Sequence, residues 1–180
     1  MEKKIEIKLM AKGDIIHSFI PNIDNKKIID IGSGVSPIFG DKSTNVDKTT
    51  LAYFKKKLKD DNFSIPNYIE ADAHALPFEN GEFDYAILSE ILEHVDEPIK
   101  VLDEAQRVAA VVIATVPNEY QWSDDKKPFT NKGHVRYFTE ETLHKLVVDS
   151  GLHILEFIKV WVQGWCHFIL VGISKYTIGK

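Results

Sequence analysis

The feature that most constrains the fold is a short apolar run that ends in an acid and a Gly-x-Gly turn, residues 27–34 (Lys-Ile-Ile-Asp-Ile-Gly-Ser-Gly). Isoleucine-rich runs of this kind are typical of strands that are buried on both faces of a parallel sheet. Gly32 and Gly34 have no Cβ, so the backbone there can turn sharply and come close to a ligand. Open α/β sheets bind ligands at the carboxyl ends of their strands. The turn therefore predicts a cofactor site.

The rest of the sequence alternates strand-like and helix-like runs. Strands are expected at residues 26–31, 44–47, 68–70, 83–88 and 111–116, and helices at residues 13–20, 50–60, 97–108 and 139–150. The first crossover is short, which predicts a one-turn helix near residues 36–40. Two β-rich runs, residues 152–162 and 166–174, predict an antiparallel hairpin. This order of elements predicts a layered α/β fold.

Composition sets outer limits on the class of protein. The 180 residues, 44% apolar and 27% charged, are expected to form one domain over residues 1–180, with residues 1–25 as a short N-terminal arm or cap. The net charge of −5 does not indicate nonspecific nucleic-acid binding, which depends on an excess of cations. The single cysteine, Cys166, rules out an intrachain disulfide and a cysteine metal cluster. We see no signal-peptide core or apolar run of membrane-spanning length, so we expect a cytoplasmic protein.

Several segments in order resemble the class I S-adenosylmethionine-dependent methyltransferases. The resemblance covers residues 26–174 and is strongest to the type 11/12 group, which includes ubiquinone-biosynthesis methyltransferases. It is carried by residues 30–34, 72–73, 76–78 with 83–85, 89–95 and 133–138, and by Asp47 at the end of the second strand. It implies a Rossmann-like, doubly wound sheet of seven strands, mostly parallel, with an antiparallel strand from the C-terminal hairpin. A third glycine, often present in the family's first motif, is replaced by Ser36.

The resemblance also implies S-adenosylmethionine as the methyl donor and S-adenosylhomocysteine as the product. Asp47 would accept hydrogen bonds from the ribose hydroxyls, and Asp72 from the adenine amino group. Asp30 would receive the ammonium group of the cofactor or hold the glycine turn. The cofactor-binding residues expected on this basis are Asp30, Gly32, Ser33, Gly34, Asp47, Lys48, Asp72, Ala73, Ser89 and Glu90.

Methyl transfer is an in-line displacement that depends mainly on positioning, and it needs a base only when the acceptor must lose a proton. We find no catalytic triad. His94, just after the fourth strand, is the best candidate for a base, and His134 is the second. Arg136 and Tyr137 lie on the same loop as His134, and a structural role is the simpler interpretation for both.

A metal site is an alternative that the sequence does not favour. Glu90, Glu93 and His94 have the spacing of one helix face, and His134 would complete a set of oxygen and nitrogen ligands. Some relatives with a similar pattern, including RNA 2′-O-methyltransferases, hold a divalent ion. Relatives that need no metal share the Glu-His pair, so no metal ligands are predicted and Mg²⁺ remains the alternative.

The expected reaction is O- or C-methylation of a small-molecule acceptor, without a nucleic-acid or membrane partner. Three other functions stay open: a non-catalytic cofactor-binding partner subunit, an RNA or protein methyltransferase, and an NAD(P)-dependent oxidoreductase. The last is disfavoured because Pro37 stands where the Gly-x-Gly-x-x-Gly fingerprint needs its third glycine. If the chain forms a homodimer, we expect the interface at the N-terminal arm and the hairpin.

Overall fold

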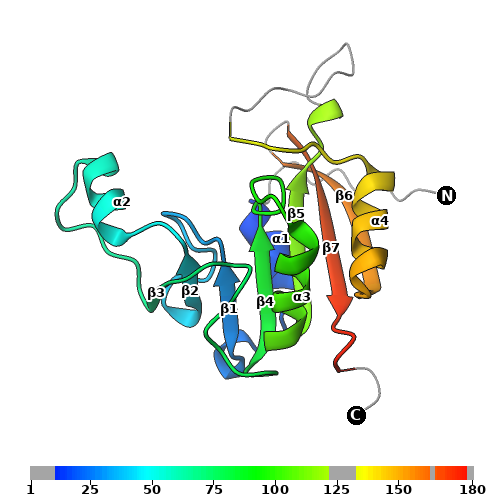
Figure 1. Ribbon diagram of the computed structural model, residues 1–180, viewed down its shortest axis with the longest axis horizontal. Helices are drawn as coiled ribbons and strands as arrows, with labels where there is room; N and C mark the ends of the chain where they lie inside the picture. The colour runs from blue at the N-terminus through cyan, green and yellow to red at the C-terminus, as the bar shows by residue number, and fades with distance from the viewer. Residues whose placement is uncertain (1–10, 122–132, 163–164, 178–180) are drawn as a thin grey trace.

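The computed structural model describes residues 11–121, 133–162 and 165–177. Within them a seven-stranded sheet has the order β3-β2-β1-β4-β5-β7-β6 (Figure 1). The strands are β1 Ile28–Ile31, β2 Thr44–Asp47, β3 Tyr68–Glu70, β4 Phe83–Ser89, β5 Ala109–Pro117, β6 His153–Val162 and β7 Trp165–Ile173. The helices are α1 Lys12–Ser18, α2 Leu51–Leu58, α3 Pro98–Val108 and α4 Glu140–Ser150, with short 3-10 turns at Ile23–Asn25, Gly40–Lys42 and Glu119–Gln121.

Strands β1 to β5 are parallel, β7 is antiparallel to β5, and β6 is antiparallel to β7. This arrangement confirms the predicted Rossmann-like class and the C-terminal hairpin. The hairpin turn at residues 163–164 and the first ten residues of the expected N-terminal arm lie outside the described residues. Among the described residues no helix is both long and apolar enough to cross a membrane.

The sheet is covered on both faces, which explains the continuous isoleucine run of β1. Ile29 and Ile31 pack in the core beneath α3 and α4, whereas Ile28 packs with α1 on the opposite face. Figure 1 shows α3 and α4 on the near side of the sheet, and α2 standing at the edge beyond β3. Alternate side chains of a strand point to opposite faces, so a strand between two helical layers needs apolar residues throughout.

Helix α4 begins as its sequence predicts. Thr139 is the N-cap, and its Oγ1 accepts the Thr142 N–H at 3.2 Å, while Thr142 Oγ1 accepts the Thr139 N–H at 2.9 Å. Threonine therefore takes the role that Glu or Gln usually plays in a capping box. The helix ends at Gly151, whose φ of 75° is the left-handed conformation that glycine adopts most easily.

Two expectations about helices are wrong. No helix forms at residues 36–40; β1 and β2 are joined by turns and the 3-10 turn at Gly40–Lys42, because Pro37 and Gly40 interrupt the segment and the Asp30 carboxylate accepts the Ile38 N–H instead. The segment after β4 is also not helical: residues 90–97 form turns, Glu90 has a φ of 56°, and α3 starts only at Pro98. Proline suits the first helical position because no intrahelical partner exists for its missing N–H.

Candidate functional site

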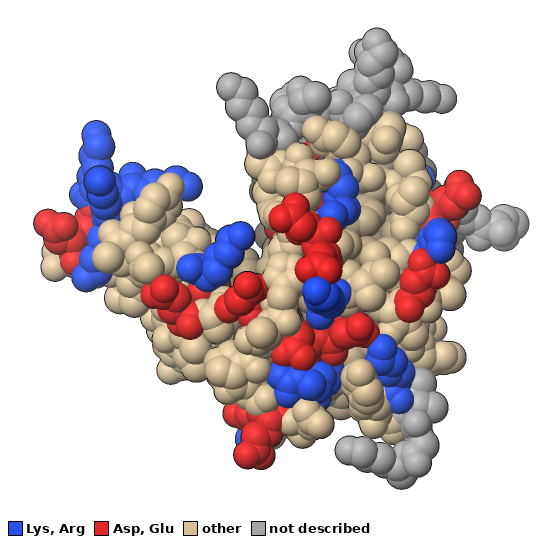
Figure 2. All heavy atoms as spheres, viewed as in Figure 1, with Lys and Arg blue, Asp and Glu red and all other residues tan. Residues whose placement is uncertain are grey.

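A cavity of about 410 Å³ lies at the carboxyl ends of the parallel strands. This volume falls within the range of small-molecule sites, roughly 300–1,000 Å³. Figure 2 shows the lysine-rich α2 standing apart from the body of the molecule, with a hollow between them. The cavity is lined by Gly32, Val46, Asp47, Lys48, Thr49, Lys57, Ala71, Asp72, Ala73, His74, Glu90, Ile91, His94 and Val95.

The glycine turn after β1 forms one wall of this cavity. The N–H groups of Gly32 and Ser33 both donate to the Val46 carbonyl, at 2.7 and 3.0 Å, which fixes the turn against β2. A Cβ on Gly32 would lie 2.5 Å from Cδ1 of Ile91, whereas a Cβ on Gly34 would meet no atom of the described residues within 4 Å. Gly32 is therefore needed for close packing, and Gly34 leaves open space beside the turn.

Asp47, the last residue of β2, connects the two loops that flank it. Its Oδ2 accepts the Gly34 N–H at 3.1 Å and its Oδ1 accepts the Thr49 N–H at 2.8 Å. A carboxylate has about four lone-pair sites, so these two bonds leave acceptor capacity on the side that lines the cavity. The arrangement holds a negatively charged acceptor at the cavity wall.

Asp30 lies under the turn and does not line the cavity. It is 1% exposed, and its Oδ2 accepts the Ile38 N–H at 2.8 Å. Burial raises the pKa of this carboxyl from 3.8 to about 6, against the opposing effects of the Ile38 N–H and the Lys12 charge. Asp30 thus provides a carboxylate whose negative charge the protein alone compensates poorly.

Asp72 stands at the rim beyond β3. Its Oδ1 accepts the His74 N–H at 2.9 Å and contacts His74 Nδ1 at 2.7 Å, and these bonds to His74 lower the pKa of Asp72. Its side chain is 61% exposed, so the carboxylate is ionised and accessible at neutral pH. The adjacent Ala73 is partly buried against the core beneath the cavity.

The Glu90 side chain is bound by residues that are distant from it in the sequence. Its Oε1 accepts the Thr115 hydroxyl at 2.9 Å and lies 3.4 Å from Lys12 Nζ, and its Oε2 lies 3.4 Å from His167 Nδ1. Burial alone would raise the pKa of Glu90, but His167, Lys12 and Thr115 outweigh burial and lower it. The carboxylate is anchored by β5, β7 and α1.

Arg136 fixes the turn that follows Glu90. Its Nη1 donates to the carbonyls of Leu92, at 2.8 Å, and Val95, and its Nη2 donates to the Asp96 carbonyl at 2.9 Å. Because residues 92–96 are not helical, no intrahelical N–H groups bind these carbonyls. The Arg136 guanidinium donates to all three instead. The structural role that the sequence analysis preferred for Arg136 agrees with these contacts.

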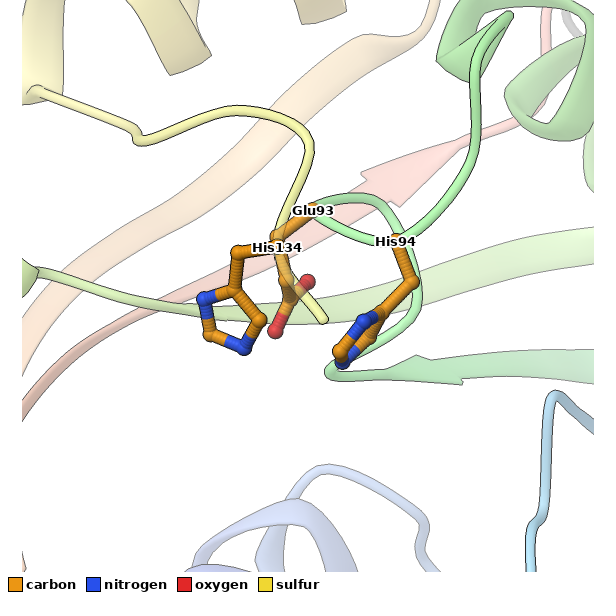
Figure 3. Close-up of side chains that lie close together, drawn as sticks. All are labelled: Glu93, His94 and His134. Carbon is orange, nitrogen blue, oxygen red and sulfur yellow. The ribbon is translucent and has the colours of Figure 1, made fainter. Parts of the chain in front are cut away.

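Two histidines and two carboxyl groups meet beside the cavity. The rings of His94 and His134 have centroids 4.6 Å apart at 85° (Figure 3), and His94 Nδ1 contacts the Gly133 carbonyl at 2.8 Å. His134 Nδ1 contacts Glu119 Oε1 at 2.6 Å. Glu93 is fully buried; burial, with the charges of Glu90 and Glu119, raises its pKa to about 9. Burial raises the pKa of Glu119 to about 7 and lowers that of His134.

The structure separates the predicted site residues into three groups. Those that line the cavity are Gly32, Asp47, Lys48, Asp72, Ala73, Glu90 and His94. Gly34 contacts the cavity wall through Asp47, and His134 stacks edge-on against His94. Outside the lining are Asp30 and two serines: Ser33, whose buried Oγ has no hydrogen-bond partner among the described residues, and Ser89, whose Oγ lies 3.4 Å from Thr115 Oγ1.

Sequence reasoning missed two partners of these residues. Glu119 follows β5, at the same edge of the sheet as Asp47 and Asp72, so the rule that ligands bind at carboxyl ends of strands was a usable signal for it. His167 reaches Glu90 because β7 pairs with β5, where His167 is opposite Pro117. No local signal marks such a long-range register.

Asp30→Asn is expected to change how stability depends on pH. Folding raises the pKa of Asp30 from 3.8 to about 6, so the protonated side chain stabilises the folded state fully below pH 3.8. This contribution is lost as the pH rises through about 6. The loss is about 3 kcal/mol, because each pKa unit corresponds to about 1.4 kcal/mol. Asparagine keeps an acceptor for the Ile38 N–H and carries no charge. Urea unfolding from pH 4 to 7 should therefore show the stability of the variant rising relative to wild type; a pH-independent difference would contradict this.

Comparisons with known proteins agree with this geometry. Residues 30–111 match the family model described as a methyltransferase domain. A search of curated proteins finds no match. Among solved structures, a methyltransferase from Methanosarcina mazei has 17% identity and a TM-score of 0.66, covering 93% of this chain and 99% of its own. One from Aquifex aeolicus has 15% identity and a TM-score of 0.64, covering 91% and 89%.

A third similar structure contains bound S-adenosylmethionine. Magnesium protoporphyrin IX methyltransferase from Synechocystis, with bound S-adenosylmethionine, has 15% identity and a TM-score of 0.62, covering 91% of this chain and 78% of its own. These structural likenesses show a shared fold. The chain is thus similar to the methyltransferase domain family over residues 30–111, and its fold is that of S-adenosylmethionine-dependent methyltransferases.

Proposed function

We propose that the cavity at β1–β4 binds S-adenosylmethionine and that the chain transfers its methyl group to a hydroxyl of a small molecule. The observation that carries the proposal is the placement of Asp47 and Asp72 on the wall of one cavity, beside an open glycine turn. Vicinal ribose hydroxyls are donors that suit the remaining lone pairs of Asp47, and charge-assisted bonds of this kind are strong. Asp72 is the acceptor for the adenine amino group.

The residues present fit the cationic end of the cofactor as well. Asp30 is a buried carboxylate directly under the glycine turn, and burial leaves its charge poorly compensated. An ammonium group above the turn would stabilise that charge, directly or through water. The Synechocystis enzyme with bound S-adenosylmethionine, which shares the fold, supports the same cofactor here.

When bound, the cofactor supplies a methyl group that positive sulfur has already activated. The protein must align the methyl acceptor with the methyl group. When that acceptor is a hydroxyl, the protein must also take up its proton. His94 lines the cavity, and its Nδ1 contacts the Gly133 carbonyl. A carbonyl only accepts hydrogen bonds, so Nδ1 carries the proton and Nε2 is left as the basic nitrogen. We assign His94 the role of proton acceptor, with His134 supporting its ring.

A small acceptor is favoured over RNA by the charges near His94. Three carboxyl groups, Glu90, Glu93 and Glu119, lie in this part of the described structure, and Lys12 pairs with Glu90. Glu93, with a pKa of about 9, is uncharged at neutral pH, and Lys12 is paired with Glu90. These groups therefore offer no unpaired cation to neutralise phosphates, on which nucleic-acid binding depends. A neutral hydroxyl compound needs no such cation.

The test is methyl transfer from radiolabelled S-adenosylmethionine to three pools: small phenols and alcohols, total RNA, and unfolded protein. We expect label only in the small-molecule pool, and a large loss with His94→Ala, for which the exposed His144→Ala is the matched control. Labelling confined to RNA or protein would overturn the acceptor assignment. Absence of transfer to any pool, with cofactor binding intact, would favour a non-catalytic cofactor-binding subunit.

A further inference from the structure

Helix α2 and the residue that follows it carry four lysines within five positions. Lys56, Lys57 and Lys59 are exposed, and Lys55 is half-buried. In the described part of the chain no ion pair involves any of these side chains. The two aspartates that come next, residues 60–61, offset only half of their charge. These four lysines, here called the α2 lysine surface, therefore form a patch of net positive charge.

The fold holds this helix in a fixed position. Thr50 Oγ1 caps it by accepting the Tyr53 N–H at 3.0 Å. On the inner side of the helix Phe54 is buried, and its ring centroid lies 6.3 Å from those of Phe63 and Tyr68. The outer side carries Tyr53, which is 56% exposed, and lysines three and four positions later, which share its helix face. One exposed aromatic ring thus stands among the lysines.

The shape of the molecule makes α2 accessible to a flat surface. Figure 1 shows the helix at the outer edge of the sheet, beyond β3. In Figure 2 the blue side chains over α2 extend away from the body of the molecule. A convex, projecting patch can touch a plane, whereas single-stranded nucleic acids bind in positively charged grooves that follow their backbone. The arrangement therefore favours a planar anionic partner over a nucleic-acid strand.

We propose that the α2 lysine surface binds the anionic headgroups of a lipid bilayer, with the Tyr53 ring at the boundary between headgroups and lipid tails. Clusters of roughly four to eight lysines or arginines on a helix are typical of segments that bind anionic lipids. Tyrosine is enriched at membrane interfaces, because its ring is apolar and its hydroxyl is polar. A protein partner fits less well, since lysine is depleted from protein–protein interfaces.

Docking would bring the cavity close to the bilayer, because Lys57 belongs to both the α2 lysine surface and the cavity lining. No membrane partner was expected from the sequence, where residues 55–57 have the pattern of an ordinary solvated helix face. The structure adds two observations that this pattern lacks, the projection of α2 and the exposed Tyr53 ring. Lipid binding does not rest on the proposed function.

The experiment is co-sedimentation of the full chain with vesicles of phosphatidylcholine, either alone or mixed with phosphatidylglycerol. Wild type is expected to bind only the vesicles that contain phosphatidylglycerol, and added salt should weaken this binding because it screens exposed charges. The triple variant Lys55→Gln, Lys56→Gln, Lys59→Gln should bind about 100-fold more weakly, since each lysine near an anionic surface contributes roughly fivefold. Tyr53→Ser should weaken binding several-fold, because it removes an apolar ring that leaves water on binding.

The matched control is the triple variant Lys42→Gln, Lys100→Gln, Lys145→Gln. It has the same net charge as the first triple variant, but its substitutions replace exposed lysines outside α2, so it should bind vesicles like wild type. Equal binding by the two triple variants would overturn the proposal, as would equal binding of wild type to both kinds of vesicle or to neither.

Two further measurements on the same samples separate the alternatives. Binding to single-stranded RNA without binding to the anionic vesicles would indicate a nucleic-acid surface and would overturn the proposal as well. S-adenosylmethionine binding, measured without vesicles, tests the proposed function separately. A chain that binds the cofactor but not the vesicles would keep the proposed function and lose the lipid surface, and the reverse result would do the opposite.

Discussion

Gly32→Ala is expected to lower the free energy of unfolding by about 2–5 kcal/mol. The residue has a φ of 75°, and a side chain in the left-handed region costs roughly 1–2 kcal/mol. The new methyl group would also lie 2.5 Å from Cδ1 and 2.9 Å from Cγ1 of Ile91, and overpacking of this kind costs about 1–3 kcal/mol. Because the turn forms the cavity wall, affinity for S-adenosylmethionine should fall with stability. Urea unfolding and calorimetric titration measure the two effects.

Gly34→Ala is the matched control for this substitution. Gly34 also has a positive φ, of 57°, but an added Cβ would meet no atom of the described residues within 4 Å. We therefore expect only the backbone cost of about 1–2 kcal/mol. The difference between the two variants measures the contact with Ile91. Equal losses of stability in the two variants would show that the close packing of Gly32 on Ile91 is unimportant.

Arg136→Met is expected to reduce methyl transfer at least tenfold and stability by about 2–4 kcal/mol. The guanidinium donates to the carbonyls of Leu92, Val95 and Asp96, within the turn that carries Glu93 and His94. Methionine keeps a long side chain but leaves these partly buried acceptors unsatisfied, and each unsatisfied group costs about 1–3 kcal/mol when water cannot reach it. Once the turn loosens, His94 loses its fixed place. The rate at saturating cofactor is the measurement.

Arg107→Met provides the comparison for Arg136→Met. Arg107 donates to the carbonyls of Leu76 and Phe78, at 2.9 and 2.7 Å, in the loop before β4. Its loss should destabilise the protein by a similar amount and leave the turn around His94 in place. The rate per folded molecule should then stay near wild type. A parallel fall in rate for both variants would mean that Arg136 acts only through general stability.

Much of the fold could be predicted from the sequence because its signals are local. The Ile28–Ile31 run, the Thr139 cap and Gly151 each determine a strand or a helix end by short-range physics, and the structure places them as expected. The expected helix at residues 36–40 and the helix-face placement of Glu90, Glu93 and His94 were wrong for a different reason. There, Asp30 and Arg136, distant in sequence, satisfy the backbone groups that a helix would otherwise satisfy.

The site was predictable to the extent that it follows the ends of strands. Asp47 and Asp72 were predicted from the family resemblance, and both line the cavity because Asp47 ends β2 and Asp72 lies just after β3. The environment of Glu93 was not predictable, since its neighbours Glu119 and His134 come from separate loops. That its carboxylate has no hydrogen-bond partner among the described residues is a property of the folded chain alone. The same applies to Glu90, whose spacing suggested a metal ligand but whose carboxylate lies close to His167 and Lys12 in the folded chain.

The most direct test of the account is calorimetric titration of the purified chain with S-adenosylmethionine and S-adenosylhomocysteine, repeated with Asp47→Asn. We expect saturable binding of both ligands to wild type, weakened roughly 10- to 100-fold in the variant, because a hydrogen bond to a charged group contributes about 1.5–3 kcal/mol. Asp61→Asn, the same chemical change at an exposed position outside the cavity, should bind like wild type. No binding by folded wild type, or equal affinity in Asp47→Asn, would contradict the assignment of this cavity.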